Sequence, residues 1–255
     1  MGRVLAFLYG VVCYAVFFAA FLYLMGFIAG AYVPKGINDG IVTAPLVAIV
    51  IDLALVAAFG VQHSVMARPG FKSWLTRFVS PAVERSTFVL AASLVLVLLY
   101  WQWRPLPTVV WSVSDPAAVE LLWVLYLAGF GLVLAASFVI DHFDLFGLRQ
   151  VWLHLLRRQY VHPQFTVTWI YRFVRHPIYL GLLLAFWSAP TMTVGRLVFA
   201  LGMSVYILIG IRYEERDLVH FIGEDYRRYR ERVPMLVPRP GATHEVVKPA
   251  RVGDA

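Results

Sequence analysis

The stretch from Val4 to Gly30 reads VLAFLYGVVCYAVFFAAFLYLMGFIAG and contains no charged residue. A helix needs about 20 consecutive apolar residues to cross the hydrocarbon core of a bilayer. This stretch is long enough for one crossing, and no small-residue cleavage site of the signal-peptide kind follows it. We therefore expect an uncleaved first transmembrane helix.

The composition of the whole chain is that of an integral membrane protein. Of its 255 residues 60% are hydrophobic and 15% are charged, and the mean hydropathy is +0.72. The net charge of +7 fits basic loops on one side of a bilayer, and no nucleic-acid-binding motif accompanies it. The single cysteine, Cys13, excludes a disulfide or a cysteine metal site within the chain.

Four further apolar zones follow the first helix. Three are single spans, and the fourth is longer than one span needs and is interrupted by SAPTMTVG at residues 188–195. We interpret the fourth zone as a helical hairpin whose first helix is short. The fold class is therefore all-α, a polytopic membrane bundle with five or six transmembrane segments; the zones are Ile41–Gln62, Ser86–Trp103, Ala118–Ile140 and Pro177–Ile211.

The basic residues of the connections predict the orientation. The connections after the second and fourth segments hold four and five of them, whereas each of the other two holds one. Because cytoplasmic loops are enriched in Lys and Arg, both termini are predicted to be cytoplasmic. The residues concerned are Arg68, Lys72, Arg77, Arg85, Arg149, Arg157, Arg158, Arg172 and Arg175.

Two short amphipathic stripes predict helices lying on the membrane surface. One comprises Phe71, Trp74, Leu75 and Phe78, and Ser80–Pro81 after it predicts the start of the next helix. The other comprises Ile222, Tyr226, Tyr229 and Val233. We expect one membrane domain over residues 1–240 and a mobile tail over 241–255.

Acidic residues gather where helices end, at positions that the helix dipole disfavours. Asp141, His142 and Asp144 directly follow the fourth segment, with Arg149 nearby. A salt bridge to Arg149 and a role in substrate binding both remain open. We predict no metal site, because the ligand spacing of this cluster is unconvincing.

The last segment ends in RYEERD, residues 212–217. Arg212, Glu215 and Arg216 share one helical face, and Glu214 and Asp217 share another. Salt bridges at a solvated helix end would explain the acidic residue on one of these faces but hardly the acidic residues on both. The two glutamates are therefore candidate functional residues.

The motif RHPIYLG, residues 175–181, opens the short helix of the hairpin. Pro177 suits the first helical position and His176 the cap, while Arg175 and the free N–H groups would form a positive pocket for a carboxylate or phosphate. Tyr179 offers a π face, and Gly181 lets a ligand or another backbone come close. An ordinary helix start with an interfacial arginine is the alternative.

Taken together, these groups describe a receptor for a ligand with a carboxylate, hydroxyls or an ammonium, and a cationic centre. S-adenosylmethionine has all of these features. The chain contains no glycine-rich Rossmann loop, P-loop, HExxH or GxSxG motif. Soluble-type cofactor folds are thereby excluded.

Two long ordered motifs carry a family resemblance. FTVTWIYRFVRHPIYLG (165–181) and RYEERDLVHFIGEDYRRYRERVP (212–234) resemble the isoprenylcysteine carboxyl methyltransferase superfamily, integral membrane enzymes that use S-adenosylmethionine. QHSVMARPGFK (62–72) and DHFDLFGLRQVW (141–152) resemble its branch of bacterial methanethiol S-methyltransferases. The chain departs from the pattern at Trp169, where the family commonly has glycine or another small residue.

The resemblance implies methyl transfer from S-adenosylmethionine to a small thiol, with cofactor binding over about residues 141–238. Glu215 matches the acid that faces the cofactor, and Arg212 or Glu214 would turn toward the acceptor. His142 or His63 would take the thiol proton, although a structural hydrogen bond would explain either histidine, and Asp141 would affect turnover. The residues matched to the cofactor pocket are Tyr171, His176, Pro177, Tyr179, Gly181 and Glu215, with Gln164, Phe165 and Thr166 as weaker matches. Arg175 joins the cofactor-binding candidates through the positive pocket at the helix start.

Two other functions remain open. The acceptor could be a lipid, a quinone or a prenylated carboxylate, which a wide lateral opening between helices would favour. Alternatively, the chain could be an accessory membrane protein that keeps the fold without the reaction. We expect a small-molecule substrate, a lipid bilayer around the protein, no nucleic acid and no obligate protein partner.

Overall fold

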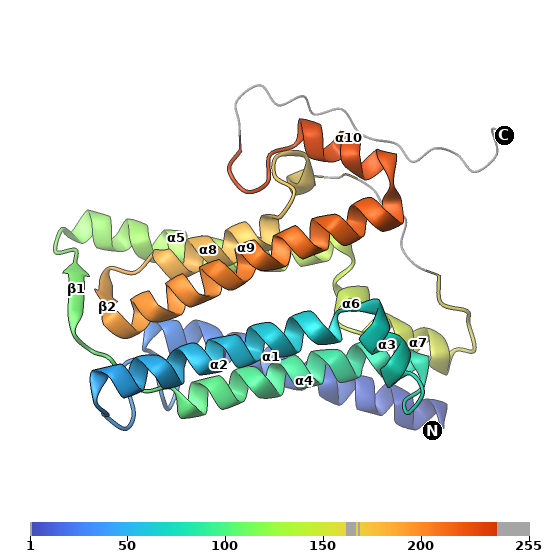
Figure 1. The fold of residues 1–255 in the computed structure, drawn as a ribbon, viewed down its shortest axis with the longest axis horizontal. Coiled ribbons are helices and arrows are strands. Elements are labelled where there is room, and N and C mark those ends of the chain that lie inside the picture. The colour runs from blue at the N-terminus through green and yellow to red at the C-terminus, as the bar shows by residue number, and fades with distance from the viewer. Residues whose placement is uncertain (1, 162–166, 168, 239–255) are drawn as a thin grey trace.

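The computed structural model describes residues 2–161, 167 and 169–238, and these residues form a helical bundle (Figure 1). Five helices are long and apolar enough to cross a membrane, so the chain is a multi-pass membrane protein, as predicted. They are α1 (Arg3–Ala29), α2 (Pro45–Met66), α4 (Pro81–Gln102), α5 (Pro116–Ile140) and α9 (Val194–Ile222). The predicted tail, 241–255, lies outside the described residues.

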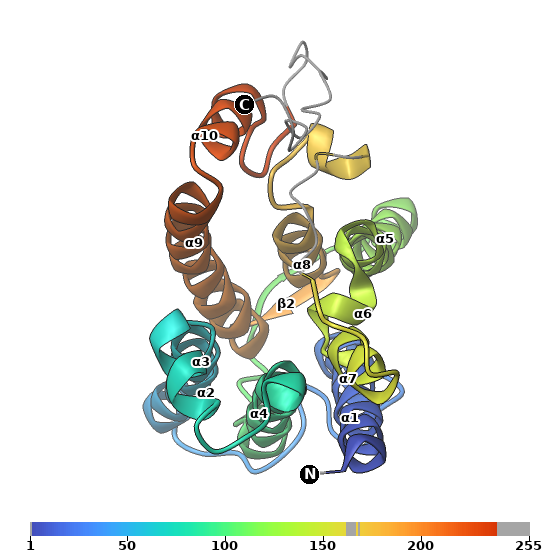
Figure 2. The same cartoon turned by 90° about the vertical axis from the view of Figure 1, so that its right-hand side faces the viewer.

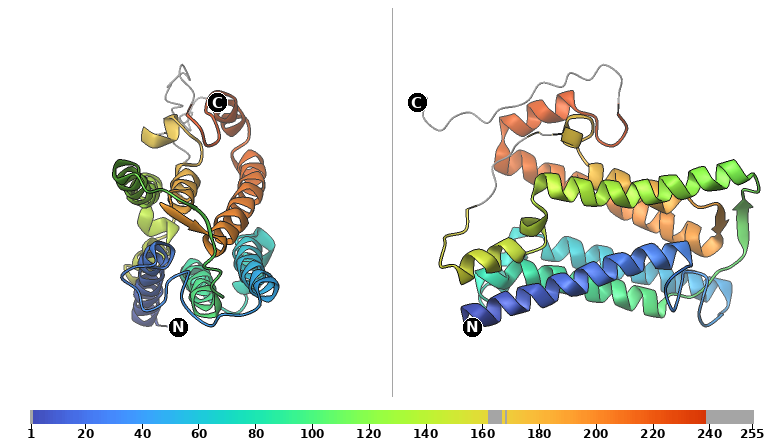
Figure 3. Two further views of the ribbon diagram at one scale, coloured as in Figure 1. Left: turned by 90° about the vertical axis from the view of Figure 1, so that its left-hand side faces the viewer. Right: turned by 180° about the vertical axis from the view of Figure 1, so that it is seen from behind.

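Most of the shorter elements lie at the two ends of the bundle. The end that carries the N-terminus also carries α3, α6, α7 and α10, and we call it the α10 end (Figures 1 and 3). The opposite end carries the two strands, and we call it the sheet end. The shorter elements are α3 (Pro69–Leu75), β1 (Val109–Ser112), α6 (His142–Leu145), α7 (Leu148–Leu155), the 3-10 helix η1 (Trp169–Arg172), α8 (Pro177–Trp187), β2 (Thr191–Thr193) and α10 (Glu224–Arg232).

Proline fixes where many of these helices begin. Pro45, Pro81 and Pro116 stand in the first turn of α2, α4 and α5, where a missing N–H costs nothing. Ser80 accepts a hydrogen bond from the amide of Ala82, so the start predicted at Ser80–Pro81 is confirmed. The spans predicted from Ile41 and Ser86 therefore begin at Pro45 and Pro81 instead.

Viewed along their axes, the helices form a ring (Figure 2). Helix α5 packs against α8, α9 against α2, and α4 against both α2 and α1. The hydroxyl of Tyr126 on α5 donates a hydrogen bond to the carbonyl of Met25 on α1, and this contact closes the ring. Sequence neighbours are thus often not spatial neighbours.

The predicted hairpin of α8 and α9 is present, and an extended segment connects its helices. With 11 residues, α8 rises only about 16 Å, roughly half the hydrocarbon thickness. The chain then continues as β2, which pairs with β1 from the connection after α4. This pairing supplies the backbone hydrogen bonds that a non-helical segment lacks in a membrane. The strands were not predicted.

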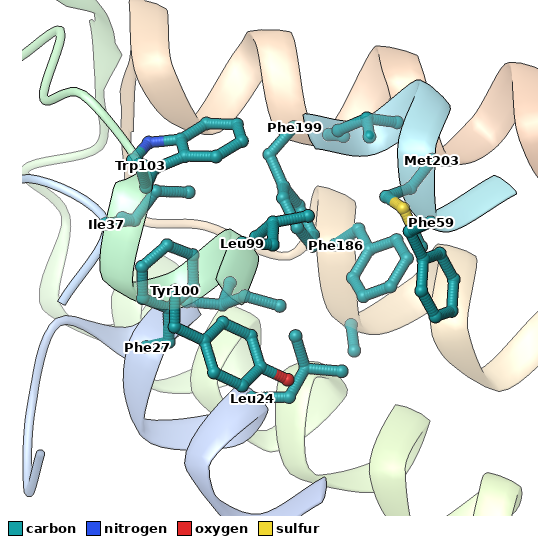
Figure 4. Packing of buried hydrophobic residues seen from close by; sticks show 14 of the residues in the cluster. Leu24, Phe27, Ile37, Phe59, Leu99, Tyr100, Trp103, Phe186, Phe199 and Met203 are labelled. Carbon is teal, nitrogen blue, oxygen red and sulfur yellow. The ribbon is translucent and has the colours of Figure 1, made fainter. Parts of the chain in front are cut away.

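Aromatic side chains fill the ring toward the sheet end (Figure 4). Trp103 and Phe27 are fully buried, and the Trp103 and Phe199 rings lie 5.7 Å apart between centroids. Phe186 packs against Phe199 at 5.2 Å, so one cluster joins α1, α4, α8 and α9. The buried residues of this cluster are hydrophobic, and none of them is a predicted site residue.

Candidate functional site

The first turn of α8 places three of the predicted site residues. His176 is the cap residue of the helix and Pro177 stands in its first turn, as the sequence predicted. His176 is only 4% exposed, because the chain that follows α10 covers it. Arg175 directly precedes it, so both side chains enter the bundle at the α10 end.

Arg175 and His176 share one oxygen of Glu215 on α9. Arg175 Nε lies 2.8 Å and His176 Nε2 lies 2.9 Å from Glu215 Oε1. Both members of the Arg175–Glu215 pair are nearly buried, with side chains 10% and 12% exposed. The positive pocket expected at this helix start is therefore neutralised by Glu215, and the pair joins α8 to α9.

Arg175 also binds the end of α10. Its Nη1 donates hydrogen bonds to the carbonyl oxygens of Arg230, at 2.8 Å, and Val233. The backbone amides of Arg175 and His176 donate to the carbonyls of Pro234 and Met235. The segment after α10 is thereby attached to the start of α8.

The second short helix predicted from the sequence is present as α10, but its apolar stripe faces the protein rather than the membrane surface. Tyr226, Tyr229 and Val233 are buried in one cluster with Val167. The Tyr229 hydroxyl donates a 2.7 Å hydrogen bond to the carbonyl of Tyr171 on η1. The stripe in the sequence could not distinguish a membrane surface from a protein surface.

Glu214 lies among tyrosines. Its Oε2 accepts a 2.7 Å hydrogen bond from the hydroxyl of Tyr179, and it lies close enough to Tyr171, Tyr206 and Tyr226 for electrostatic interaction. Burial, and next the charge of Glu214, raise the pKa of Tyr171 above its ordinary value, so this phenol stays protonated. A carboxylate surrounded by phenol rings is suited to a cation.

His63 approaches this group from α2, which packs against α9. Its Nδ1 lies 2.8 Å from the hydroxyl of Tyr206, and its ring packs against Phe88 on α4, with centroids 4.9 Å apart. His63 Nε2 makes no hydrogen bond with the part of the chain that the structure describes. Sequence reasoning missed Tyr206, although it precedes Glu214 by eight positions and thus shares its helical face.

His142 is hydrogen-bonded at both ring nitrogens. Nε2 lies 2.8 Å from the Tyr14 hydroxyl, and Nδ1 lies 2.8 Å from Ser137 Oγ. The ring is stacked on Phe138 with centroids 4.2 Å apart, and burial lowers the pKa of His142. These contacts favour the alternative that His142 forms structural hydrogen bonds, because neither ring nitrogen is free to accept a proton.

Of the two alternatives left open for the acidic cluster at the end of α5, the salt bridge to Arg149 is present. Arg149 Nη1 lies 3.3 Å from carboxylate oxygens of both Asp141 and Asp144. Asp141 also accepts a hydrogen bond from the amide of Asp144. The backbone of Asp141 has a φ of 137°, an unusual value for a residue other than glycine.

The other predicted site residues are dispersed. Arg212 is exposed and makes no ion pair with the described residues, whereas Asp217 pairs with Arg68 at 2.7 Å. A Cβ added to Gly181 would lie 2.5 Å from the carbonyl oxygen of Gly129, so this glycine allows α8 and α5 to approach closely. Gln164, Phe165 and Thr166 lie outside the described residues.

Known relatives cover most of the chain. It is 52% identical over 236 residues to methanethiol S-methyltransferase 1 of Bradyrhizobium diazoefficiens, covering 92% of this chain and 83% of that protein. It is 49% identical to methanethiol S-methyltransferase of Mycobacterium tuberculosis, covering 94% and 98%. It is also 32% identical to Nurim of Mus musculus, covering 69% and 70%. No solved structure matches.

The family model named NnrU protein matches residues 52–238. This range includes both long motifs on which the predicted resemblance rested, and that resemblance is confirmed. The chain therefore belongs to the NnrU protein family.

Proposed function

We propose that this protein transfers a methyl group from S-adenosylmethionine to methanethiol and releases dimethyl sulfide. The observation that carries the proposal is the name methanethiol S-methyltransferase, shared by relatives that are 49% and 52% identical over more than nine tenths of the chain. The arrangement of groups at the α10 end supports the proposal independently.

The chemistry of these groups fits a sulfonium nucleoside. Glu214 supplies a negative charge, and Tyr171, Tyr179 and Tyr206 supply π faces and hydroxyls around it. Bound S-adenosylmethionine would supply a methyl group activated by a positive sulfur. In our proposal Glu214 and these tyrosines hold the sulfonium end.

The remaining matched residues shape the pocket in this proposal. Arg175 and His176 hold Glu215 and the segment after α10, and thereby fix how the ends of α8 and α9 meet. Pro177 fixes the start of α8, and Gly181 fixes its distance from α5. Gln164, Phe165 and Thr166 are proposed as further contacts on the strength of the resemblance alone.

We assign the thiol proton to His63. The thiolate is the reactive form, and an acceptor near the sulfur favours it. His63 is held at Nδ1 by Tyr206 and is free of described partners at Nε2, whereas both nitrogens of His142 are occupied. Arg85, whose guanidinium lies over the Phe88 ring beside His63, adds positive charge that favours a thiolate.

The proposal gives Asp141 and Arg212 lesser parts. Asp141 would affect turnover indirectly. Its unusual backbone conformation and its ion pair with Arg149 set the angle at which the chain passes from α5 to α6. Arg212 receives no role at the reacting atoms, since its side chain is exposed and unpaired among the described residues. We also propose that the α10 end faces the cytoplasm of an inner membrane, because the basic connections lie there.

Headspace analysis tests the proposal. Purified protein in lipid nanodiscs, given S-adenosylmethionine and methanethiol, should release dimethyl sulfide, and Glu214→Gln should release far less. If the cofactor binds and methyl groups enter a lipid, quinone or prenylated carboxylate instead, the acceptor is wrong. If the cofactor does not bind at all, the protein is an accessory protein and the activity is wrong.

A further inference from the structure

The chain that leaves α10 turns back over the start of α8. Val233 ends α10 in an extended conformation, because the proline that follows it disfavours helical geometry at this position. Residues 233–236, which we call the strap, then run alongside Arg175 and His176. The strap is neither helix nor strand, so its position depends on contacts with other elements.

Backbone hydrogen bonds attach the strap to the residues before α8. The amides of Arg175 and His176 donate to the carbonyls of Pro234, at 2.9 Å, and Met235, at 3.2 Å. Arg175 Nη1 donates to the carbonyl of Val233. Both amides precede the first residue of α8, so they take no part in the hydrogen bonds of that helix. The strap can therefore detach while α8 stays intact.

The side chains of the strap point to the proposed cofactor site. Met235 and Leu236 pack against the same buried hydrophobic cluster as Tyr179 and Tyr206. These are two of the tyrosines that surround Glu214 in the proposed function. The strap therefore closes over the part of the bundle in which the sulfonium end of the cofactor would be held.

A cofactor needs a route from water to this position. A charged nucleoside dissolves poorly in hydrocarbon, so it arrives from an aqueous side rather than through the lipid. At the α10 end, the contacts of Glu215 with Arg175 and His176 are nearly buried, and the strap covers them. In the closed arrangement these groups leave little room for a nucleoside to enter.

We propose that the strap is the gate of the cofactor site. It opens to admit S-adenosylmethionine and to release S-adenosylhomocysteine, and it closes over the bound cofactor. This inference rests on the proposed function, since it takes Glu214 and its tyrosines as the place where the cofactor binds. It adds that an apolar segment held by backbone hydrogen bonds controls exchange of the cofactor.

Hydrogen exchange at the amides of Arg175 and His176 reports the opening, because these amides exchange when their bonds to the strap break. The purified protein in nanodiscs is measured by mass spectrometry with and without S-adenosylhomocysteine. At about ten times its dissociation constant, a ligand that binds only under the closed strap should slow this exchange by about 10-fold. Unchanged exchange with the ligand bound would overturn the proposal.

Binding kinetics of S-adenosylhomocysteine separate a gate from an ordinary contact. Met235→Ala combined with Leu236→Ala should raise both the association and the dissociation rate constants by about 10-fold, because a loosened strap is open for more of the time. Loss of a contact to the bound ligand would raise the dissociation rate alone. Val237→Ala, at a position 73% exposed on the same segment, is the control and should change neither rate.

The outcomes distinguish the gate from the proposed function. An unchanged association rate in the folded double variant would overturn the gate, and the wild-type exchange measurement decides if that variant fails to fold. If S-adenosylhomocysteine binds but no dimethyl sulfide forms, the acceptor is wrong and the exchange data alone decide on the gate. If S-adenosylhomocysteine does not bind, the proposed function fails and the gate fails with it.

Discussion

The phenol of Tyr179 on α8 donates a 2.7 Å hydrogen bond to Oε2 of Glu214 on α9. The bond orients the carboxylate without removing its charge, because a neutral phenol is the donor. Glu215, the neighbouring acid, is instead paired with Arg175 and His176. The two adjacent glutamates thus have different partners, and the role proposed for Glu214 rests on this difference.

Replacing Glu214 by Gln should weaken binding of S-adenosylmethionine by about 30-fold, since a buried charge pair contributes about 2 kcal/mol. S-adenosylhomocysteine has no sulfonium charge, so its affinity should change much less. Calorimetric titration of both ligands measures the difference. Glu224→Gln on the exposed face of α10 is the matched control. Equal losses for the two ligands would contradict the role given to Glu214.

Replacing Glu215 by Ala should reduce the free energy of unfolding by about 3 kcal/mol, because it leaves the Arg175 guanidinium nearly buried without its partner. Asp217→Ala, which breaks the more exposed pair with Arg68, should cost about 1 kcal/mol or less. Thermal unfolding in nanodiscs compares the two. Equal shifts in the unfolding temperature would show that the Arg175–Glu215 pair does not hold α8 to α9.

Replacing Gly181 by Ala should destabilise the protein by about 2 kcal/mol, since the added methyl group meets the Gly129 carbonyl at 2.5 Å. Gly210→Ala is the control, because nothing lies within 4 Å of a Cβ at that position on α9. The control should be neutral or stabilising by up to about 1 kcal/mol. If Gly181→Ala folds as stably as the control, α8 and α5 are not packed as closely as described.

His142 should make stability depend on pH. Burial lowers its pKa in the folded protein, so the unfolded chain takes up a proton first as the pH falls. The contribution of His142 to the free energy of unfolding is fully present above about pH 6.5, the ordinary pKa of histidine. It is lost as the pH falls through the lower pKa that His142 has in the folded protein. The unfolding temperature of His142→Gln should therefore vary less with pH than that of the wild type. His220→Gln, at an exposed position, should keep the wild-type slope.

His63→Gln should lower kcat by about 100-fold at neutral pH while leaving the affinity for S-adenosylhomocysteine unchanged. Activity should recover as the pH approaches the ordinary pKa of the thiol, because solution then supplies the thiolate. His142→Gln should show no such alkaline recovery. A pH-independent deficit in His63→Gln would remove the proton-accepting role.

Much of the fold is readable from the sequence because local patterns decide it. Uninterrupted apolar runs predicted the membrane helices, and Pro81 and Pro177 marked helix starts. The strands could not be predicted, since β1 and β2 are stabilised by pairing across some 80 residues of chain. The buried face of α10 likewise depends on Val167, which is distant in sequence.

For the candidate site, the sequence could single out several of the residues that meet in the structure but not their contacts. The motifs located Arg175, His176 and the two glutamates. The hydrogen-bond partners of these residues are distant in sequence. Glu215 binds residues 39 and 40 positions away, and Tyr206 binds His63 across 143 positions. Only the folded structure shows that Glu215 forms an ion pair with Arg175 and that both ring nitrogens of His142 are hydrogen-bonded.

Transfer of an isotopically labelled methyl group tests the central claim most directly. Purified protein is given S-adenosylmethionine with a trideuterated methyl group and unlabelled methanethiol, and the headspace gas is analysed by mass spectrometry. The proposed reaction predicts dimethyl sulfide with one deuterated methyl group, formed together with S-adenosylhomocysteine. Cofactor binding without labelled dimethyl sulfide would contradict the assignment.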